Sequence, residues 1–177
     1  MIKNALETKL VTDKVIFHYP WAFEPHAYNK ESTPLYSVIL LLEKHQKELI
    51  DKINGKMQIA YKLAEEMYHI DKEDMKFMAS PLRDGDDDCN ADMMETGKYF
   101  IRATSHSKPD IVDENCKPIY DPSKVFDGVY GRANIYFKPY KMNDRIGLSC
   151  KLISLQVFKD RYNVIRAYSN PKEDFKN

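Results

Sequence analysis

The sequence predicts a mainly β domain into which one long helix is inserted. Three observations support this prediction. Apolar and polar residues alternate over several short segments, the segment 44–69 follows the helical period instead, and proline-rich or acidic loops separate these segments. The elements follow the order strand, strand, helix, strand, strand, strand. Five strands with an inserted helix fit the OB fold, a five-stranded, partly open Greek-key barrel, and an α+β sandwich remains the alternative.

The first part of the chain is predicted to form two strands with a loop between them. Apolar residues alternate with polar ones over 10–19, which indicates a strand. The segment 20–34 contains three prolines and is predicted to be a loop that holds Trp21 and Phe23. Residues 35–42 are apolar on both faces, so this second strand is predicted to lie at the centre of a sheet.

The segment 44–69 is predicted to be an amphipathic helix. Its apolar residues recur three or four positions apart, and lysines and glutamates fill many of the positions between them. Gly55 costs such a helix roughly 1 kcal/mol relative to alanine, so we expect a kink or a break there. The predicted buried face consists of Leu49, Ile53, Met57, Ala60, Ala64 and Met67.

In the second half of the chain, strands are predicted to alternate with polar loops. The segment 80–96 is predicted to be a solvated acidic loop and 97–105 a third strand. Loop signals follow over 106–123, with a short helical turn expected at 122–126. The two remaining strands are predicted over 129–138 and 145–158. We therefore expect one domain over residues 1–160 and a partly flexible tail over 161–177.

Composition excludes several classes of protein. The chain has 177 residues, of which 43% are hydrophobic and 31% charged, as expected for a globular domain with one core. It has no run of about 18 apolar residues, and its first residues lack the apolar segment of a secretory signal, so neither a membrane span nor secretion is expected. Three widely spaced cysteines indicate reduced thiols in a cytoplasmic protein.

The net charge is zero, but the charges are unevenly distributed. Residues 1–96 contain 12 Lys/Arg and 18 Asp/Glu, whereas residues 97–177 contain 15 Lys/Arg and 9 Asp/Glu. The second half is therefore cationic by six charges. Because the local field matters more than the total charge when a polyanion docks, a neutral chain of this kind still allows nucleic-acid binding.

The segment 129–138, VYGRANIYFK, combines a core face with an aromatic and cationic face. Read with the strand period, Val129, Gly131, Ala133, Ile135 and Phe137 form an apolar set that suits a core. The opposite set is Tyr130, Arg132, Asn134, Tyr136 and Lys138. Such a face can stack bases and neutralise phosphates of a single nucleic-acid strand, with Tyr130, Arg132, Tyr136 and Lys138 as the contacting residues. Tyrosines that pair across strands, with solvating cations beside them, are the structural alternative.

The strand 97–105 has a second face of this kind. Lys98, Phe100 and Arg102 alternate along it and are candidates for the same role, although Phe100 would equally suit a core. Trp21, in its proline-flanked segment, is either a further stacking residue or a plug over one end of the fold.

The acidic segment offers a rival interpretation as a calcium site. Its carboxylate and amide residues match the ligand positions of an EF-hand loop at Asp84, Asp86, Asp88, Asn90, Asp92 and Glu95. Cys89, however, stands where that loop needs glycine, Pro81 cuts off the incoming helix, and the segment leads into a strand. We therefore expect a solvated acidic loop and no metal or cofactor.

Other functional classes find less support. The sequence contains no glycine-rich phosphate loop, no H-E-x-x-H and no G-x-S-x-G motif, so no enzyme is expected. Two alternatives to nucleic-acid binding remain. One is a metal-binding or metal-dependent nucleic-acid enzyme built on residues 84–95, and the other is a protein-interaction module that uses the same sheet face.

Several blocks of the chain together resemble a family of phage single-stranded DNA-binding proteins, long catalogued as a domain of unknown function. These blocks are FHYPWAFEPHAYN at 17–29, PLYSVILLLEK at 34–44, PLRDGD at 81–86 and the segment 97–140. Within the last block, the most specific pieces are P-D-I-V-D, D-P-S-K-V and the pairing of Gly128 with Arg132 and Ala133. The resemblance covers roughly residues 10–160.

The resemblance implies an OB-fold protein that coats and protects single-stranded DNA during phage replication or recombination. It implies binding without sequence preference, without catalysis and without a cofactor, in the cytoplasm of the host cell. The implied partners are single-stranded DNA and phage replication or recombination proteins, and a homodimer is a further expectation. The end of the chain, KEDFKN, only faintly resembles the acidic, aromatic-capped tails with which many such proteins contact partners.

Overall fold

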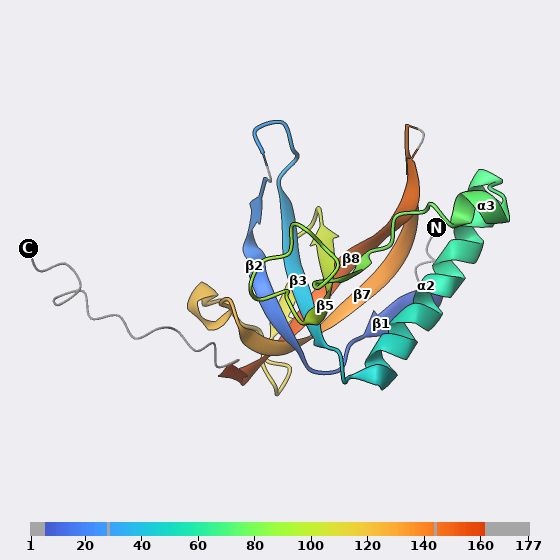
Figure 1. Ribbon diagram of the computed structural model, residues 1–177. Helices are drawn as coiled ribbons and strands as arrows, with labels where there is room; N and C mark the ends of the chain where they lie inside the picture. Colours follow the sequence, from blue (N-terminus) through green and yellow to red (C-terminus); the bar gives the residue numbers. More distant parts are fainter. Residues whose placement is uncertain (1–5, 28, 144, 162–177) are drawn as a thin grey trace, which may run out of the picture.

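A computed structural model describes residues 6–27, 29–143 and 145–161 of the chain (Figure 1). The two hairpins β2–β3 and β7–β8 project from the same side of the sheet, and the long helix α2 lies along β1 and β7. The elements are β1 (Lys9–Val11), β2 (Val15–His26), β3 (Leu35–Glu43), α2 (Lys47–Tyr68), α3 (Lys72–Met75), β4 (Leu82–Asp84), β5 (Lys98–Ser105), β6 (Asp110–Val112), a 3₁₀ turn (Pro122–Lys124), β7 (Val129–Met142) and β8 (Arg145–Arg161).

Within the described residues, five strands pair in a closed ring. Its order is β7, β2, β3, β5, β8 and back to β7, and all of these pairings are antiparallel except the parallel pairing of β5 with β8. The short strand β1 adds to β7, β4 adds to β5 and β6 adds to β8. The mainly β fold with one long helix is confirmed, and β3 lies between two partners as predicted.

The core lies inside the ring and beneath α2. Alternation along β7 is confirmed, because the whole apolar set from Val129 to Phe137 is buried while the opposite set is at least partly exposed. The predicted helix face is buried except for Met67, which is half exposed. Contrary to our expectation, α2 runs through Gly55 without a break, because the buried residues on either side of Gly55 hold it against the sheet.

The prediction of a loop over 20–34 is wrong in its first part. β2 continues to His26, so Trp21 lies on a strand and pairs with Ser37. The register between β2 and β3 shifts on both sides of Trp21, and Pro20 and Pro25 lie within these irregular stretches. Because a proline cannot donate to a regular ladder but is tolerated at a bulge, these shifts allow the strand to continue.

The predicted strand 10–19 is divided into β1 and the start of β2, and two short strands were missed, one of which lies inside the predicted acidic loop. β4 pairs with β5, and β6, inside the predicted loop 106–123, pairs in parallel with β8. The short turn expected near Pro122 is confirmed, and it starts at Asp121, whose carboxylate accepts a hydrogen bond from the Ser123 N–H at 3.0 Å. Residues 162–177, most of the predicted tail, lie outside the described residues, so the domain boundary stays a prediction.

Two further observations concern the described part of the chain. No helix in it is both long and apolar enough to cross a membrane. Its three cysteines are unpaired: Cys89 and Cys116 are exposed, and Cys150 is buried in the core.

Candidate nucleic-acid interface

The outer face of β2, β3 and β5 is built from three rows of side chains. Residues directly opposite each other in a sheet point to the same face, so the strand register defines the rows. The first row contains Ile16, Leu41 and Phe100, the second contains His18, Ile39 and Arg102, and the third contains Trp21, Ser37 and Thr104. These rows differ strongly in how far they are covered.

The first row forms a small second core on the outside of the ring. Ile16, Leu41 and Phe100 are buried together, and Met94 from the acidic segment packs against them. Phe100 is only 4% exposed, and the Arg83 guanidinium lies 5.2 Å from the centre of its ring. The acidic segment thus covers the position at which Phe100 would otherwise meet a base.

The acidic segment 85–97, which we call the lid, is held over the sheet by specific contacts, while more than half of its residues remain exposed to solvent. The Lys44 ammonium donates to the carboxylates of Asp84 at 2.8 Å and Asp86 at 2.7 Å. A Cβ on residue 85 would lie 2.0 Å from the Glu95 carbonyl oxygen, so only glycine allows this close approach. The first two carboxylates of the EF-hand-like pattern, Asp84 and Asp86, are therefore bound by a lysine. In the described chain no cluster of His, Cys, Asp or Glu is arranged to hold a metal ion.

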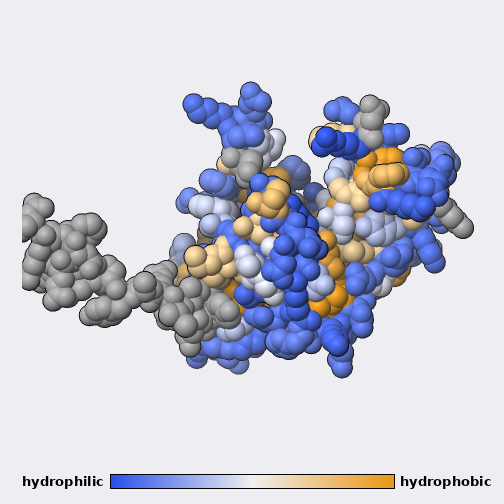
Figure 2. All heavy atoms as spheres, in the orientation of Figure 1, coloured by the Kyte–Doolittle hydropathy of each residue, from blue (hydrophilic) through white to orange (hydrophobic). Residues whose placement is uncertain are grey.

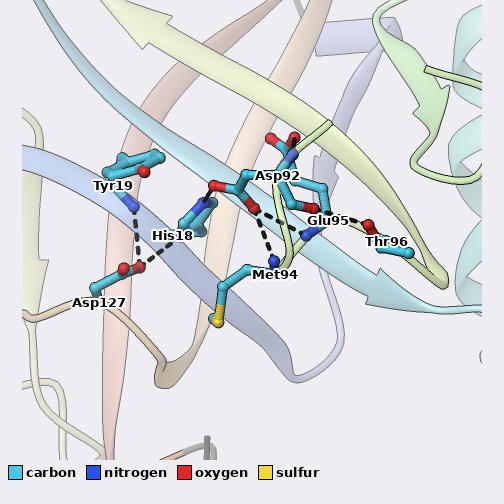
Figure 3. A network of polar contacts seen from close by, with 7 residues as sticks. All are labelled: His18, Tyr19, Asp92, Met94, Glu95, Thr96 and Asp127. Carbon is cyan, nitrogen blue, oxygen red and sulfur yellow. Dashed lines mark hydrogen bonds and ion pairs between the residues drawn. The ribbon is translucent and has the colours of Figure 1, made fainter. Parts of the chain in front are cut away.

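His18 joins this lid to the sheet and to the loop before β7 (Figure 3). Its imidazole is 2% exposed, with Nε2 2.6 Å from the Asp92 carboxylate and Nδ1 2.6 Å from the Asp127 carboxylate. The ring thus bridges two carboxylates, one on the lid and one on the loop before β7. The backbone N–H groups of Met94 and Glu95 also donate to Asp92, at 2.8 Å and 3.1 Å.

Because of this arrangement, the stability of the fold should fall at acid pH. Partial burial alone would raise the pKa of the Asp92 carboxyl, but the hydrogen bond and charge of His18 and the two backbone donors outweigh burial and lower that pKa below its usual value. A lowered pKa in the folded state contributes stability above the unfolded pKa, about 3.9, and that contribution is lost as pH falls below it.

The free energy of unfolding, measured with urea, should fall between pH 6 and pH 3. We expect this fall to be smaller in an Asp92→Asn variant. The measurement compares the change in the free energy of unfolding of both proteins over this range. An identical pH dependence in the variant would contradict the role given to Asp92.

Part of the second and third rows lines a hollow of about 430 Å³, which we name the Trp21 hollow. β2 contributes Tyr19, Trp21 and His26; β3 contributes Ser37 and Ile39; β5 contributes Arg102; and the lid contributes Asn90, Asp92 and Glu95. The Trp21 ring stacks on that of His26, with centroids 4.2 Å apart and planes 11° apart. Trp21 is 43% exposed, so its ring remains available to a ligand.

Tyr19 stands in the hollow because of an unusual backbone. Its φ of 45° lies in the left-handed region, and its N–H donates to the Asp127 carboxylate at 3.2 Å. The Asp92 carboxylate raises the pKa of Tyr19, with smaller effects from burial and from Asp127. The ring therefore stays neutral at physiological pH and suits stacking.

The carboxylates at the edge of the hollow are already engaged. Asp92 binds His18, and the buried Glu95 accepts a hydrogen bond from the Asp92 N–H at 3.0 Å. Arg102 is exposed on the opposite side of the hollow, on β5. The arrangement suits an aromatic ring on the Trp21 side and an anion near Arg102, while the acidic lid disfavours phosphates at its own edge.

The predicted residues of β7 do not lie in this hollow. Tyr130 packs against the covered first row, and the Lys14 ammonium lies 4.4 Å from the centre of its ring. The Nε of Arg132 donates to the Thr12 carbonyl oxygen at 2.9 Å, so Arg132 fixes the connection between β1 and β2. Tyr136 and Lys138 lie further along β7, where β1 and β8 are the neighbouring strands.

Of the eight predicted residues, the structure brings Trp21 and Arg102 together. Lys98 is buried at the start of β5, where its backbone bonds to Glu95 and Gly85 on the lid. The sequence analysis missed Tyr19 and His26. Trp21 and His26 would have been found together if the segment 20–26 had been interpreted as a bulged strand, but its prolines favoured a loop.

A five-strand ring with this order is the arrangement of the OB fold, whose exposed face commonly binds oligonucleotides or oligosaccharides. The profile of one family, described as "Enterobacter phage Enc34, ssDNA-binding protein", matches residues 8–177, and the chain belongs to this family. This membership confirms the resemblance inferred from the sequence and the prediction of a binding protein that is not an enzyme. No curated protein sequence matches the chain.

Solved structures of phage proteins share the fold. The single-stranded DNA-binding protein from bacteriophage Enc34 in complex with ssDNA is 16% identical, with a TM-score of 0.70, and the match covers 89% of this chain and 88% of that chain. A C-terminal truncation of the Enc34 protein is 19% identical, with a TM-score of 0.71 and the same coverage. The single-stranded DNA-binding protein gp2.5 of bacteriophage T7 is 16% identical, with a TM-score of 0.61, covering 96% of this chain and 94% of that chain.

Proposed function

We propose that this protein binds single-stranded DNA without sequence preference and that the Trp21 hollow holds the bases. The observation that carries this proposal is that the stacked pair of Trp21 and His26 and the exposed Arg102 line the same hollow. Aromatic rings beside a cation suit a single strand, because every base has a π-face and every nucleotide has a phosphate.

The position of the hollow in the fold supports the same ligand. In OB folds, the outer face of the second and third strands and the loops after the first and fourth strands bind oligonucleotides. In chain order, the five ring strands are β2, β3, β5, β7 and β8, so β3 and β5 are the second and third strands. The loop after the first strand is the β2–β3 hairpin, and the loop after the fourth is the β7–β8 hairpin. Figure 2 shows the hairpins as two separate projections, and the end of the β2–β3 hairpin is hydrophilic. The relative from bacteriophage Enc34, solved with ssDNA, supports this ligand.

The open surface of the hollow is largely aromatic, with Tyr19, Trp21 and His26 contributed by β2. The two lid carboxylates are engaged, because Asp92 binds His18 and the buried Glu95 accepts a hydrogen bond from the Asp92 N–H. Stacking tolerates any base, so we expect the protein to coat single-stranded DNA during phage replication or recombination, in the host cytoplasm. Phage replication or recombination proteins as partners, and a homodimer, stay predictions.

A gel shift with oligo-dT and with duplex DNA at two salt concentrations tests the proposal. We expect preference for the single strand and weaker binding at higher salt, with a slope in log affinity of about −0.7 per phosphate contacted. Binding should be unchanged by EDTA, because the contacts proposed here involve no metal ion. Absence of binding at low salt, or a preference for duplex, would overturn the proposal, and loss of binding in EDTA would favour the metal-dependent alternative.

A further inference from the structure

A second cationic surface lies on the outer face of β1, β7 and β8, away from the Trp21 hollow. Tyr136 on β7 pairs directly with Lys9 on β1 and with Lys151 on β8, so the three side chains form one row across three strands. Lys138, two residues further along β7, points to the same side and is exposed. We name Lys9, Tyr136, Lys138 and Lys151 the β7–β8 lysine face.

Within the described part of the chain, the lysines of this face, Lys9, Lys138 and Lys151, have no carboxylate as an ion-pair partner, although lysines elsewhere, such as Lys14 and Lys44, are paired. Burial, together with the charge of the neighbouring Lys138, lowers the pKa of Lys151, as expected for two ammonium groups on one face. An anion between them would relieve their mutual repulsion.

The face also carries a half-buried aromatic ring between two of its cations. Tyr136 stands between Lys9 and Lys151, and neither an aromatic partner nor a side-chain hydrogen bond is found for it among the described residues. This combination of ring and cations matches a nucleotide chain better than an acidic peptide, because the ring can meet a base while the lysines meet its flanking phosphates.

The two surfaces belong to different sectors of one ring. β7 pairs with β2 only near Tyr130, and β1 replaces β2 as its neighbour at Asn134–Tyr136, so the lysine face lies beyond the strands that form the hollow. The lysine face is therefore available to a strand that extends beyond the hollow. A longer strand can follow the outside of the ring from one surface to the other.

We propose that the β7–β8 lysine face binds the phosphate backbone of the same DNA strand where it continues beyond the Trp21 hollow. This inference rests on the proposed function, because the hollow is taken as the first site. It assigns to Tyr136 and Lys138 a role in holding long strands, and it adds Lys9 and Lys151 to the residues that contact DNA.

The test compares a Lys138→Gln/Lys151→Gln variant with the wild-type protein on two lengths of oligo-dT, about 8 and about 30 nucleotides, with DNA in excess. We expect unchanged affinity for the short oligonucleotide, a loss of about 10-fold or more for the long one at low salt, and a salt slope reduced by about 1.4 for the long one only. A Lys47→Gln/Lys62→Gln variant, which removes two exposed lysines of α2, serves as the matched control.

Three results would overturn the proposal. Equal losses on both lengths would place these lysines in the first site, and unchanged binding on both would remove them from the interface. A loss equal to that of the α2 control would show that the effect comes from the net charge of the protein and not from this face. Failure of the wild-type protein to bind either oligonucleotide would instead contradict the proposed function. Thermal unfolding of each variant shows that affinity is compared between folded proteins.

Discussion

Replacing Trp21 with alanine is expected to cause the largest loss of DNA affinity of any single substitution in the hollow. Stacking on one aromatic side chain is worth about 1–3 kcal/mol per base, so Trp21→Ala should weaken binding of a short oligo-dT by roughly 5- to 150-fold. The fold should persist, because Trp21 is 43% exposed and lies outside both buried clusters. Fluorescence anisotropy of a dye-labelled oligonucleotide measures the change.

Two further variants define this effect. Trp21→Phe keeps a ring and should retain much of the affinity, whereas Phe77→Ala removes an aromatic side chain that is 86% exposed but far along the chain from the hollow and should bind normally. Normal affinity in Trp21→Ala, or an equal loss in Phe77→Ala, would show that the bases bind elsewhere.

Replacing His18 with alanine is expected to cause a large loss of stability. The substitution removes two charge-assisted hydrogen bonds from a fully buried ring and leaves Asp92 and Asp127 without their common partner. Hydrogen bonds to charged groups contribute about 1.5–3 kcal/mol each, so we expect a loss of about 3 kcal/mol or more in the free energy of unfolding, measured with urea. The lid that carries Asp92 should also become more accessible to proteases.

The matched control is His45→Ala, which truncates an exposed histidine two residues before α2 begins. It should change stability by less than about 0.5 kcal/mol. If the two histidine variants lose the same amount, His18 does not hold the lid to the sheet.

The regular elements could be predicted from the sequence because their signals are local. The alternation along β7 and the helical period of α2 each follow from positions a few residues apart, and both are confirmed. The extension of β2 through Pro20 and Pro25 could not be predicted, because the register shifts that tolerate these prolines arise from pairing with β3. The lid was missed for the same reason: its partners, Lys44 and His18, are distant in the sequence.

The candidate site was predicted only in part, because alternation along a strand reveals an outer face but not its position on the ring. Trp21 and Arg102 meet in one hollow, while Tyr136 and Lys138 lie on another sector. Burial of Phe100 depends on the lid, which strand alternation does not reveal.

The motifs that carry the family resemblance are structural in this chain. Gly85 in the LRDGD motif admits the Glu95 carbonyl, and Asp121 in DPSK caps a 3₁₀ turn. Gly128 has a φ of 88°, and its N–H donates to the Phe17 carbonyl at 2.8 Å. Arg132 bonds to the Thr12 carbonyl. These motifs therefore identify the fold more directly than they identify the DNA contacts.

Intrinsic fluorescence tests the central claim most directly, because Trp21 is the only tryptophan in the chain. Titration of the wild-type protein with oligo-dT at low salt should quench its emission in proportion to the complex formed, and added salt should reverse the quenching as the complex dissociates. Tight binding measured by anisotropy without any change in tryptophan emission would contradict the claim that bases stack in the Trp21 hollow.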